Sequence, residues 1–418
     1  MTTSKQKQIL IIAIGSAGDV HPLAALGVAL QRRGHDVVLL TNPQFGPLIE
    51  KLGLSFVPLG TIEQYAEATA NPDLWHPRKG FTAIWQMLRE GNRIVYDRIV
   101  ELAESKRTVL VGSTLAIGAR LAQEKLGISM ATVHLSPSCI LSSCRPPVLK
   151  GLWLPASLPL FVKQRVWWLI ERCMIDRVCA DDLNRLRAEL ELPPVTRIMG
   201  RWIHSPDLVL GLFPDWFGLP QSDWPANCHV TGFPLFDETF EIPSKLETFL
   251  DNGSPPIVFT PGSAMRFAKP FFNNAIEACR RLNRRGLLLT NYTEQLPVLP
   301  AFVHHENYVP LGKVLPRSAA FAYHGGIGSC AQALAAGIPH LVVPYAHDQF
   351  DNASRIHALG VGVYISHSDD VDRFTESLRQ LIETPAIIAN CRKVRDQIMD
   401  RSNAIDKACS LIEALGPR

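Results

Sequence analysis

The chain has 418 residues, of which 47% are hydrophobic and 19% charged, and its formal net charge is +3. This composition is typical of a globular protein, and so small a net charge argues against nucleic acid as a partner. The length exceeds one ordinary hydrophobic core, so we expect two domains.

The first half of the chain alternates strand and helix patterns. Residues 9–14 form a continuous apolar run, typical of a strand buried on both faces of a parallel sheet, and a glycine turn follows at 15–19. Pro22 suits the first turn of the next helix, and Gly34 ends that helix. Further strands are expected at 37–40, 109–111 and 130–135, with a helix over 115–126. The pattern predicts a doubly wound α/β domain over residues 1–235.

An unusual segment, residues 140–190, interrupts this pattern. Its run from Phe161 to Ile170 mixes two tryptophans with Lys and Arg and has apolar residues on more than one helix face. One interpretation is a helix packed against the first domain. The alternative is an acceptor lid or a membrane-surface patch, because tryptophan and basic side chains both suit an interface.

The strand and helix alternation restarts at residues 257–260, after a linker at 236–255 that is rich in Pro, Asp and Glu. Further strands are expected at 287–289, 319–323 and 341–343, which predicts a second Rossmann-like domain over 256–395. A C-terminal helix follows at 396–418. Because ligands bind beyond the carboxyl ends of parallel strands, we expect the two domains to face a cleft lined by the glycine turns.

The most informative motif is the turn His324-Gly325-Gly326-Ile327-Gly328-Ser329, which lies between a strand pattern and a helix pattern. A helix N-terminus gathers unpaired backbone N–H groups and the positive end of the helix dipole, so it binds anions. Glycines let a phosphate approach the backbone closely. The motif therefore predicts a diphosphate site, with His324, Gly326, Gly328 and Ser329 as its contacts.

Together with Asp348-Gln349 and Asn352, this motif resembles the nucleotide-sugar signature of family 1, UDP-glycosyltransferase-like, glycosyltransferases. The turn from Gly15 to Pro22 looks like that of the antibiotic and sterol branches of the family. Nearly end to end, and most closely at 232–237 and 346–352, the chain is similar to the B chain of bacterial rhamnosyltransferases of rhamnolipid synthesis. The resemblance implies a GT-B fold whose C-terminal helix crosses back to the first domain.

The resemblance also implies roles for residues of the second domain. Asp348 and Gln349 would bind hydroxyls of the transferred sugar, because a carboxylate and an amide together offer acceptors and donors. Gly262 and Ser263 would make a second phosphate contact. Tyr308 would stack on the nucleotide base, and the backbone of Val309 would read the base edge. His324, the helix dipole and the Gly262 turn would supply positive charge to the departing diphosphate.

Asp19 is the candidate catalytic base, because the resemblance places a His or an Asp in this turn. An inverting transfer needs a group that removes the acceptor's hydroxyl proton, and an Asp with the usual pKa of about 3.9 is ionised at pH 7. His21, two residues on, is a rival base or helper. The alternative for Asp19 is a structural N-cap of the helix that follows it.

The expected activity is transfer of a hexose from dTDP-rhamnose or UDP-glucose to a hydroxyl of a lipid-like or other hydrophobic acceptor. Alternatives are a sterol, hopanoid or polyketide glucosyltransferase, a nucleotide-sugar epimerase, and a non-catalytic partner subunit. No cofactor and no metal are expected, because the pair His347-Asp348 has no candidate third ligand at a recognised spacing. Nine cysteines without a C-x-x-C pair indicate a cytoplasmic protein. Peripheral contact with the inner face of the membrane is a further expectation.

Overall fold

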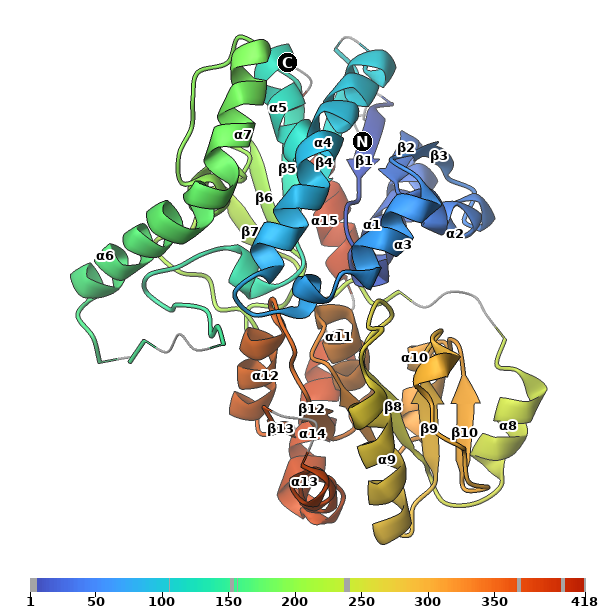
Figure 1. Ribbon diagram of the computed structural model, residues 1–418. Coiled ribbons are helices and arrows are strands. Elements are labelled where there is room, and N and C mark those ends of the chain that lie inside the picture. The colour runs from blue at the N-terminus through green and yellow to red at the C-terminus, as the bar shows by residue number, and fades with distance from the viewer. Residues whose placement is uncertain are drawn as a thin grey trace. The chain divides into compact units, whose positions relative to one another are not determined.

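The computed structural model describes residues 6–104, 106–150, 154–155, 157–236, 241–366, 370–399 and 403–416. The chain divides into two units (Figure 1). Unit 1 comprises Met1–Pro234 together with Asn403–Arg418, and unit 2 comprises Leu235–Ser402.

Unit 1 is built on a parallel sheet. Over the described residues it has seven strands in the order β3-β2-β1-β4-β5-β6-β7. The strands are β1 (Gln8–Ile12), β2 (Asp36–Thr41), β3 (Ser55–Pro58), β4 (Thr108–Ser113), β5 (Ser129–His134), β6 (Leu208–Gly211) and β7 (Cys228–Val230). The strand order reverses between β1 and β4, and β1 is fully buried because its five residues face helices on both sides of the sheet.

Helices cover this sheet. They are α1 (Ala17–Arg32), α2 (Gly46–Lys51), α3 (Ile62–Ala70), α4 (Gly80–Leu102), α5 (Ile117–Leu126), α6 (Leu160–Ile170), α7 (Asp176–Glu189) and α15 (Ala404–Glu413). The expected start of α1 at Pro22 is wrong, because the helix begins five residues earlier and contains Pro22. Gly34 ends the helix as expected, with a φ of +92°.

Unit 2 repeats the architecture with six described strands in the order β10-β9-β8-β11-β12-β13, all parallel. The strands are β8 (Ile257–Thr260), β9 (Gly286–Leu289), β10 (Val303–Glu306), β11 (Ala320–Tyr323), β12 (His340–Val342) and β13 (Gly362–Tyr364). The helices are α8 (Ser244–Asp251), α9 (Lys269–Arg281), α10 (Leu311–Val314), α11 (Ile327–Ala336), α12 (Gln349–Ala358), α13 (Val371–Glu383) and α14 (Pro385–Met399). The order reverses between β8 and β11. Helix α8 lies inside the segment 236–255 that we expected to be a linker.

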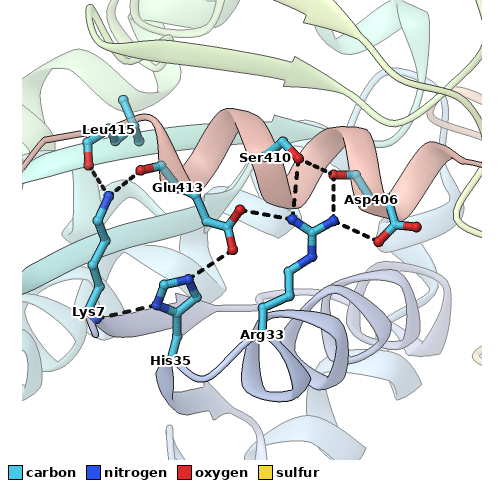
Figure 2. A network of polar contacts seen from close by, with 7 residues as sticks. All are labelled: Lys7, Arg33, His35, Asp406, Ser410, Glu413 and Leu415. Atoms are coloured by element: carbon cyan, nitrogen blue, oxygen red, sulfur yellow. Dashed lines mark hydrogen bonds and ion pairs between the residues drawn. The ribbon is translucent and has the colours of Figure 1, made fainter. Parts of the chain in front are cut away.

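The C-terminus returns to unit 1, as the resemblance implied. Helix α15, red in Figure 1, packs against α1. Figure 2 shows how it is held: the Arg33 guanidinium donates to Asp406 and Glu413, each at 2.8 Å, and His35 Nε2 lies 3.0 Å from the other Glu413 oxygen. The Lys7 ammonium donates to the carbonyls of Glu413, the last residue of α15, and of Leu415 just beyond it. Residues 396–399, expected in this helix, belong instead to α14.

Candidate functional site

The predicted site residues lie at the carboxyl edges of the two sheets, beside the points where the strand order reverses. In unit 1 the turn at Gly15 follows β1. In unit 2 the turns at Gly262 and His324 follow the neighbouring strands β8 and β11, and Asp348 follows β12. These switch points are where open α/β sheets bind ligands, so the topology brings the unit 2 candidates to one edge.

His324 packs between two glycines. A Cβ on Gly262 would lie 3.0 Å from His324 Nε2 and Cε1, and a Cβ on Gly326 would overlap the ring. Gly262 also has a φ of +107°, a conformation that side chains disfavour. The two turns are therefore shaped to hold this imidazole, which joins the edge of β8 to that of β11.

The imidazole of His324 is neutral at pH 7, because burial lowers its pKa to about 4. His324 therefore carries no positive charge in the ligand-free protein, and the charge expected of it beside a departing diphosphate stays a prediction. Its Nδ1 atom is buried without a hydrogen-bond partner. A neutral ring has one N–H, and with the proton on Nε2 it acts as a donor to an anionic oxygen.

Helix α11 begins at Ile327, three residues after this histidine, and supplies backbone donors. The Cys330 N–H makes the first helical bond, to the Gly326 carbonyl at 3.0 Å, so the N–H groups of residues 327–329 precede it. No side chain caps the helix at Gly326. A Cβ on Gly328 would meet open space, and Ser329 is partly exposed in the same turn. The helix start thus offers unpaired donors with room beside them.

The turn after β8 holds the other predicted phosphate contact. The Gly262 N–H donates to Thr260 Oγ1 at 3.3 Å, and the Met265 N–H donates to the Gly262 carbonyl at 3.2 Å. The Ser263 side chain is exposed. Its hydroxyl is therefore open to a ligand at the edge that carries His324.

The loop after β12 is tied to the His324 turn by Asn352. This side chain is fully buried, and its Nδ2 donates to the Gly325 carbonyl at 2.9 Å and to Asp348 Oδ2 at 2.8 Å. The resemblance included Asn352, but we assigned it no role. It holds the Asp348 carboxylate in a fixed position relative to the glycine turn.

The side chain of Gln349 mostly makes hydrogen bonds within its own loop. It is only 4% exposed, and its Oε1 accepts hydrogen bonds from the N–H groups of Tyr345 (2.8 Å) and Ala346 (3.1 Å). Its acceptor atom therefore braces the backbone, and the Nε2 amide is the part left to donate to a sugar hydroxyl.

Tyr308 and Val309 follow β10, a strand that the sequence analysis missed because its residues Val-His-His-Glu are mostly polar. The Tyr308 side chain is 44% exposed, whereas Val309 is 1% exposed. An exposed ring suits stacking on a planar base, and a buried side chain leaves only the backbone of Val309 for recognition.

In unit 1, Asp19 lies in the first turn of α1 and folds back over the glycine turn. Its Oδ2 accepts from the Ser16 N–H at 2.8 Å and from Ser16 Oγ at 3.2 Å. A Cβ on Gly15, whose φ is +141°, would overlap this carboxylate. Asp19 therefore braces the helix start from the third position of α1, whereas the N-cap is Ser16, so the alternative in which Asp19 is itself the N-cap is wrong. Burial raises its pKa, and the hydrogen bonds from Ser16 partly offset the rise.

His21 lies two residues further into α1 and packs edge-on against Phe45, with ring centroids 6.4 Å apart. Burial lowers its pKa to about 4, so the imidazole is neutral at pH 7. Of the two candidate bases, burial strengthens Asp19 as a proton acceptor and weakens His21.

A buried polar chain at the same edge had no sequence signal, because its members are far apart in the chain. Thr114 Oγ1 lies 2.9 Å from His134 Nδ1, and His134 Nε2 lies 2.9 Å from His204 Nδ1. Burial lowers the pKa of His204 to about 4, and burial also holds the pKa of His134 well below its usual range. Two neutral rings thus fix the orientation of the Thr114 hydroxyl at the end of β4.

The described residues contain neither a candidate metal cluster nor a candidate membrane-spanning helix. No three His, Cys, Asp or Glu side chains among them are grouped so as to hold a metal ion. No helix in the described ranges is long and apolar enough to cross a bilayer.

Two family models match the chain. Residues 9–142 match the glycosyltransferase family 28 N-terminal domain, and residues 287–413 match the erythromycin biosynthesis protein CIII-like C-terminal domain. Glycosyltransferase GtfE of Amycolatopsis orientalis is 30% identical over 393 residues, covering 90% of each chain. O-mycaminosyltylonolide 6-deoxyallosyltransferase of Streptomyces fradiae is 28% identical over 424 residues, covering 97% of each. These relatives are transferases by name and give no support to the epimerase alternative.

Solved structures share the fold over the whole chain. The glycosyltransferase of kitacinnamycin matches with a TM-score of 0.74 at 21% identity, covering 98% of this chain and 99% of that one. The spinosyn rhamnosyltransferase SpnG, solved with thymidine diphosphate, matches with a TM-score of 0.68 at 17% identity, covering 96% and 100%. Both similarities confirm the expected two-domain α/β architecture. The chain belongs to the GT-B glycosyltransferases, with an EryCIII-like C-terminal domain.

Proposed function

We propose that the chain is an inverting glycosyltransferase that moves a hexose from a nucleotide sugar to a hydroxyl of a hydrophobic acceptor. Unit 2 holds the donor and unit 1 holds the acceptor. The observation that carries the donor half is the neutral His324 ring between Gly262 and Gly326, beside the uncapped start of α11. This arrangement offers N–H donors to a diphosphate.

The proposed donor contacts follow from this geometry. His324 Nε2, the first N–H groups of α11 and the Ser263 and Ser329 hydroxyls bind the diphosphate. Tyr308 stacks on the base. Asp348 and the Gln349 amide bind sugar hydroxyls, and Asn352 positions Asp348.

In the proposed reaction Asp19 removes the proton from the acceptor hydroxyl as its oxygen attacks the anomeric carbon. The bond between that carbon and the phosphate oxygen breaks, and the nucleoside diphosphate leaves with the bonding electrons. Fixed N–H donors stabilise the charge that develops on the leaving oxygen. We propose that no metal ion is needed, because these donors take that role.

For the sugar, the names of similar proteins favour a 6-deoxyhexose. The Streptomyces fradiae relative is a 6-deoxyallosyltransferase and SpnG is a rhamnosyltransferase. We therefore place dTDP-rhamnose first and UDP-glucose second. For the acceptor we propose a hydroxylated lipid, as the rhamnolipid resemblance implies, with a sterol, hopanoid or polyketide as the alternative.

The test is product analysis by mass spectrometry. The protein is incubated, with EDTA present, with dTDP-rhamnose or UDP-glucose and a set of acceptors: a hydroxyalkanoyloxyalkanoate, a sterol, and a polyketide aglycone. A product heavier than the acceptor by one rhamnosyl unit supports the leading version. Glucosyl product alone would favour the alternative donor. Transfer seen only after a divalent ion is restored would contradict the metal-independent step.

A further inference from the structure

One surface of unit 1, formed by α6 and the turn that follows it, combines large apolar side chains with exclusively positive exposed charge. Its apolar members are Leu160 (46% exposed), Phe161 (71%), Trp168 (40%), Leu169 (48%) and Met174 (59%). Figure 1 shows α6 running out from the end of α7 to the margin of unit 1. We call these residues, with Arg165 and Arg172, the α6 surface.

The exposed side chains of α6 recur every four residues. Positions 160–161, 164–165, 168–169 and 172–173 are exposed, whereas Lys163, Trp167 and Glu171 are buried. Residues four apart lie on one side of a helix. The α6 surface is therefore a continuous stripe rather than a set of scattered residues.

The exposed charged side chains on this stripe are all positive. Within residues 157–177, all of which the structure describes, both acidic side chains are buried. Glu171 is 2% exposed and pairs with Arg197 at 2.8 Å, and Asp176 is 7% exposed and accepts from the backbone N–H of Arg197 at 2.8 Å. The exposed charged side chains in this range are Arg165, Arg172 and Arg177.

Two of these arginines flank an exposed tryptophan. The guanidinium carbons of Arg165 and Arg172 lie 5.3 Å and 6.0 Å from the centre of the Trp168 ring. An amphipathic ring beside cationic groups is the arrangement that interfacial helices use to lie between lipid headgroups and acyl chains.

We propose that the α6 surface docks unit 1 onto an anionic lipid bilayer. This goes beyond the proposed transfer reaction, because it concerns where the protein acts and not what it transfers. A second copy of the chain fits poorly, since a two-fold contact would bring two positively charged copies of the same surface together. A small acceptor molecule would leave much of the stripe bare, since Leu160 to Met174 extends roughly 21 Å along the helix axis.

The test is sedimentation of the full chain with vesicles. We expect binding to vesicles of phosphatidylcholine with ~30% phosphatidylglycerol, little binding to phosphatidylcholine alone, and release at high salt, because anionic headgroups attract arginine electrostatically. The double change Arg165→Gln and Arg172→Gln should weaken partitioning on the order of 30-fold, and Phe161→Ser with Trp168→Ser should weaken it at any salt concentration.

Matched controls lie in unit 2. Arg392→Gln with Lys393→Gln removes the same charge from exposed positions of α14, and Val298→Ser changes a side chain that is 96% exposed. Both should bind vesicles like the parent. Nucleoside diphosphate affinity is measured for every variant. An unchanged affinity shows that the variant is folded and that its donor site is intact, independently of vesicle binding.

Three results would overturn the proposal. They are no binding of the parent chain to anionic vesicles, an equal loss in the α14 control, and equal binding of the α6 variants and the parent. Self-association of the parent that Phe161→Ser with Trp168→Ser abolishes would assign the surface to contacts between copies instead.

Discussion

The imidazole of His324 lies against Gly262, with its Nε2 atom 3.0 Å from the point that a Cβ on that glycine would occupy. The contact links the turn after β8 to the turn after β11. Both turns are therefore needed to place the Nε2 atom of His324 as a hydrogen-bond donor.

Gly262→Ala should displace His324 and weaken nucleotide-sugar binding. The added methyl group meets the ring, and the positive φ adds strain of about 1–3 kcal/mol. Calorimetric titration with UDP-glucose and dTDP-rhamnose measures the affinity, and urea unfolding measures the strain. Unchanged affinity in a destabilised variant would mean that His324 does not contact the donor.

Gly328→Ala should weaken donor binding without lowering the stability of the fold. Its methyl group meets open space and alanine favours helix, so the free energy of unfolding should stay the same or rise by up to about 1 kcal/mol. Donor affinity should fall, because the open space is where we place the diphosphate. Gly91→Ala, also facing open space but on α4, is the control and should leave affinity unchanged. Full donor affinity in Gly328→Ala would move the phosphate away from this turn.

Donor binding should strengthen as the pH falls from 7 towards 4. The pKa of His324 is about 4 in the free protein, and a bound diphosphate raises it, so the complex takes up a proton that the free protein lacks. Affinity therefore rises as the pH drops through the pKa of the complex and levels off below about 4, by at most tenfold per pH unit. An intact nucleotide sugar is the ligand to use, because its diphosphate does not titrate in this range. His324→Gln should give a flatter profile, and an identical slope in that variant would assign the proton elsewhere.

The attachment of α15 to the rest of unit 1 should depend on Glu413. Its carboxylate pairs with Arg33 and lies within hydrogen-bond distance of His35 (Figure 2). Its side chain is 22% exposed, whereas that of Asp406 is 62% exposed, so solvent screens the Asp406 pair more. Glu413→Gln should lower the free energy of unfolding by about 1 kcal/mol, and Asp406→Asn by less. Urea unfolding of both variants compares them, and a larger loss for Asp406→Asn would contradict this ranking.

Much of the fold could be predicted from strong local patterns in the sequence. The continuous apolar runs of β1 and β8, the glycine after α1 and the glycine turn before α11 are local signals, and the structure has these elements near the predicted places. Strands β3, β6, β7, β10 and β13 were not predicted. Of these, β7 and β10 lack an apolar run, since one is a three-residue Cys-His-Val strand and the other a polar Val-His-His-Glu strand. The start of α1 was misplaced because Pro22 seemed to mark it, whereas the Ser16 and Asp19 contact does.

The chemistry of the site depended on tertiary contacts that a sequence does not display. That His324 is neutral follows from burial between two turns some sixty residues apart. The bracing of the loop by Gln349 Oε1 and the tie from Asn352 to Gly325 likewise depend on how the turns after β11 and β12 fold together. Motif spacing identified the site residues but did not indicate their protonation or their hydrogen-bond partners.

The central claim is that Asp19 is the base of a sugar transfer whose donor is held by unit 2. Asp19→Asn tests it most directly, because the Asn oxygen can still accept from the Ser16 N–H and preserve the start of α1. Turnover with the best donor and acceptor should fall roughly 10²- to 10⁴-fold, while donor affinity stays at the parent value. Turnover within a few-fold of the parent, with the same donor affinity, would contradict the account and pass the role of base to another group.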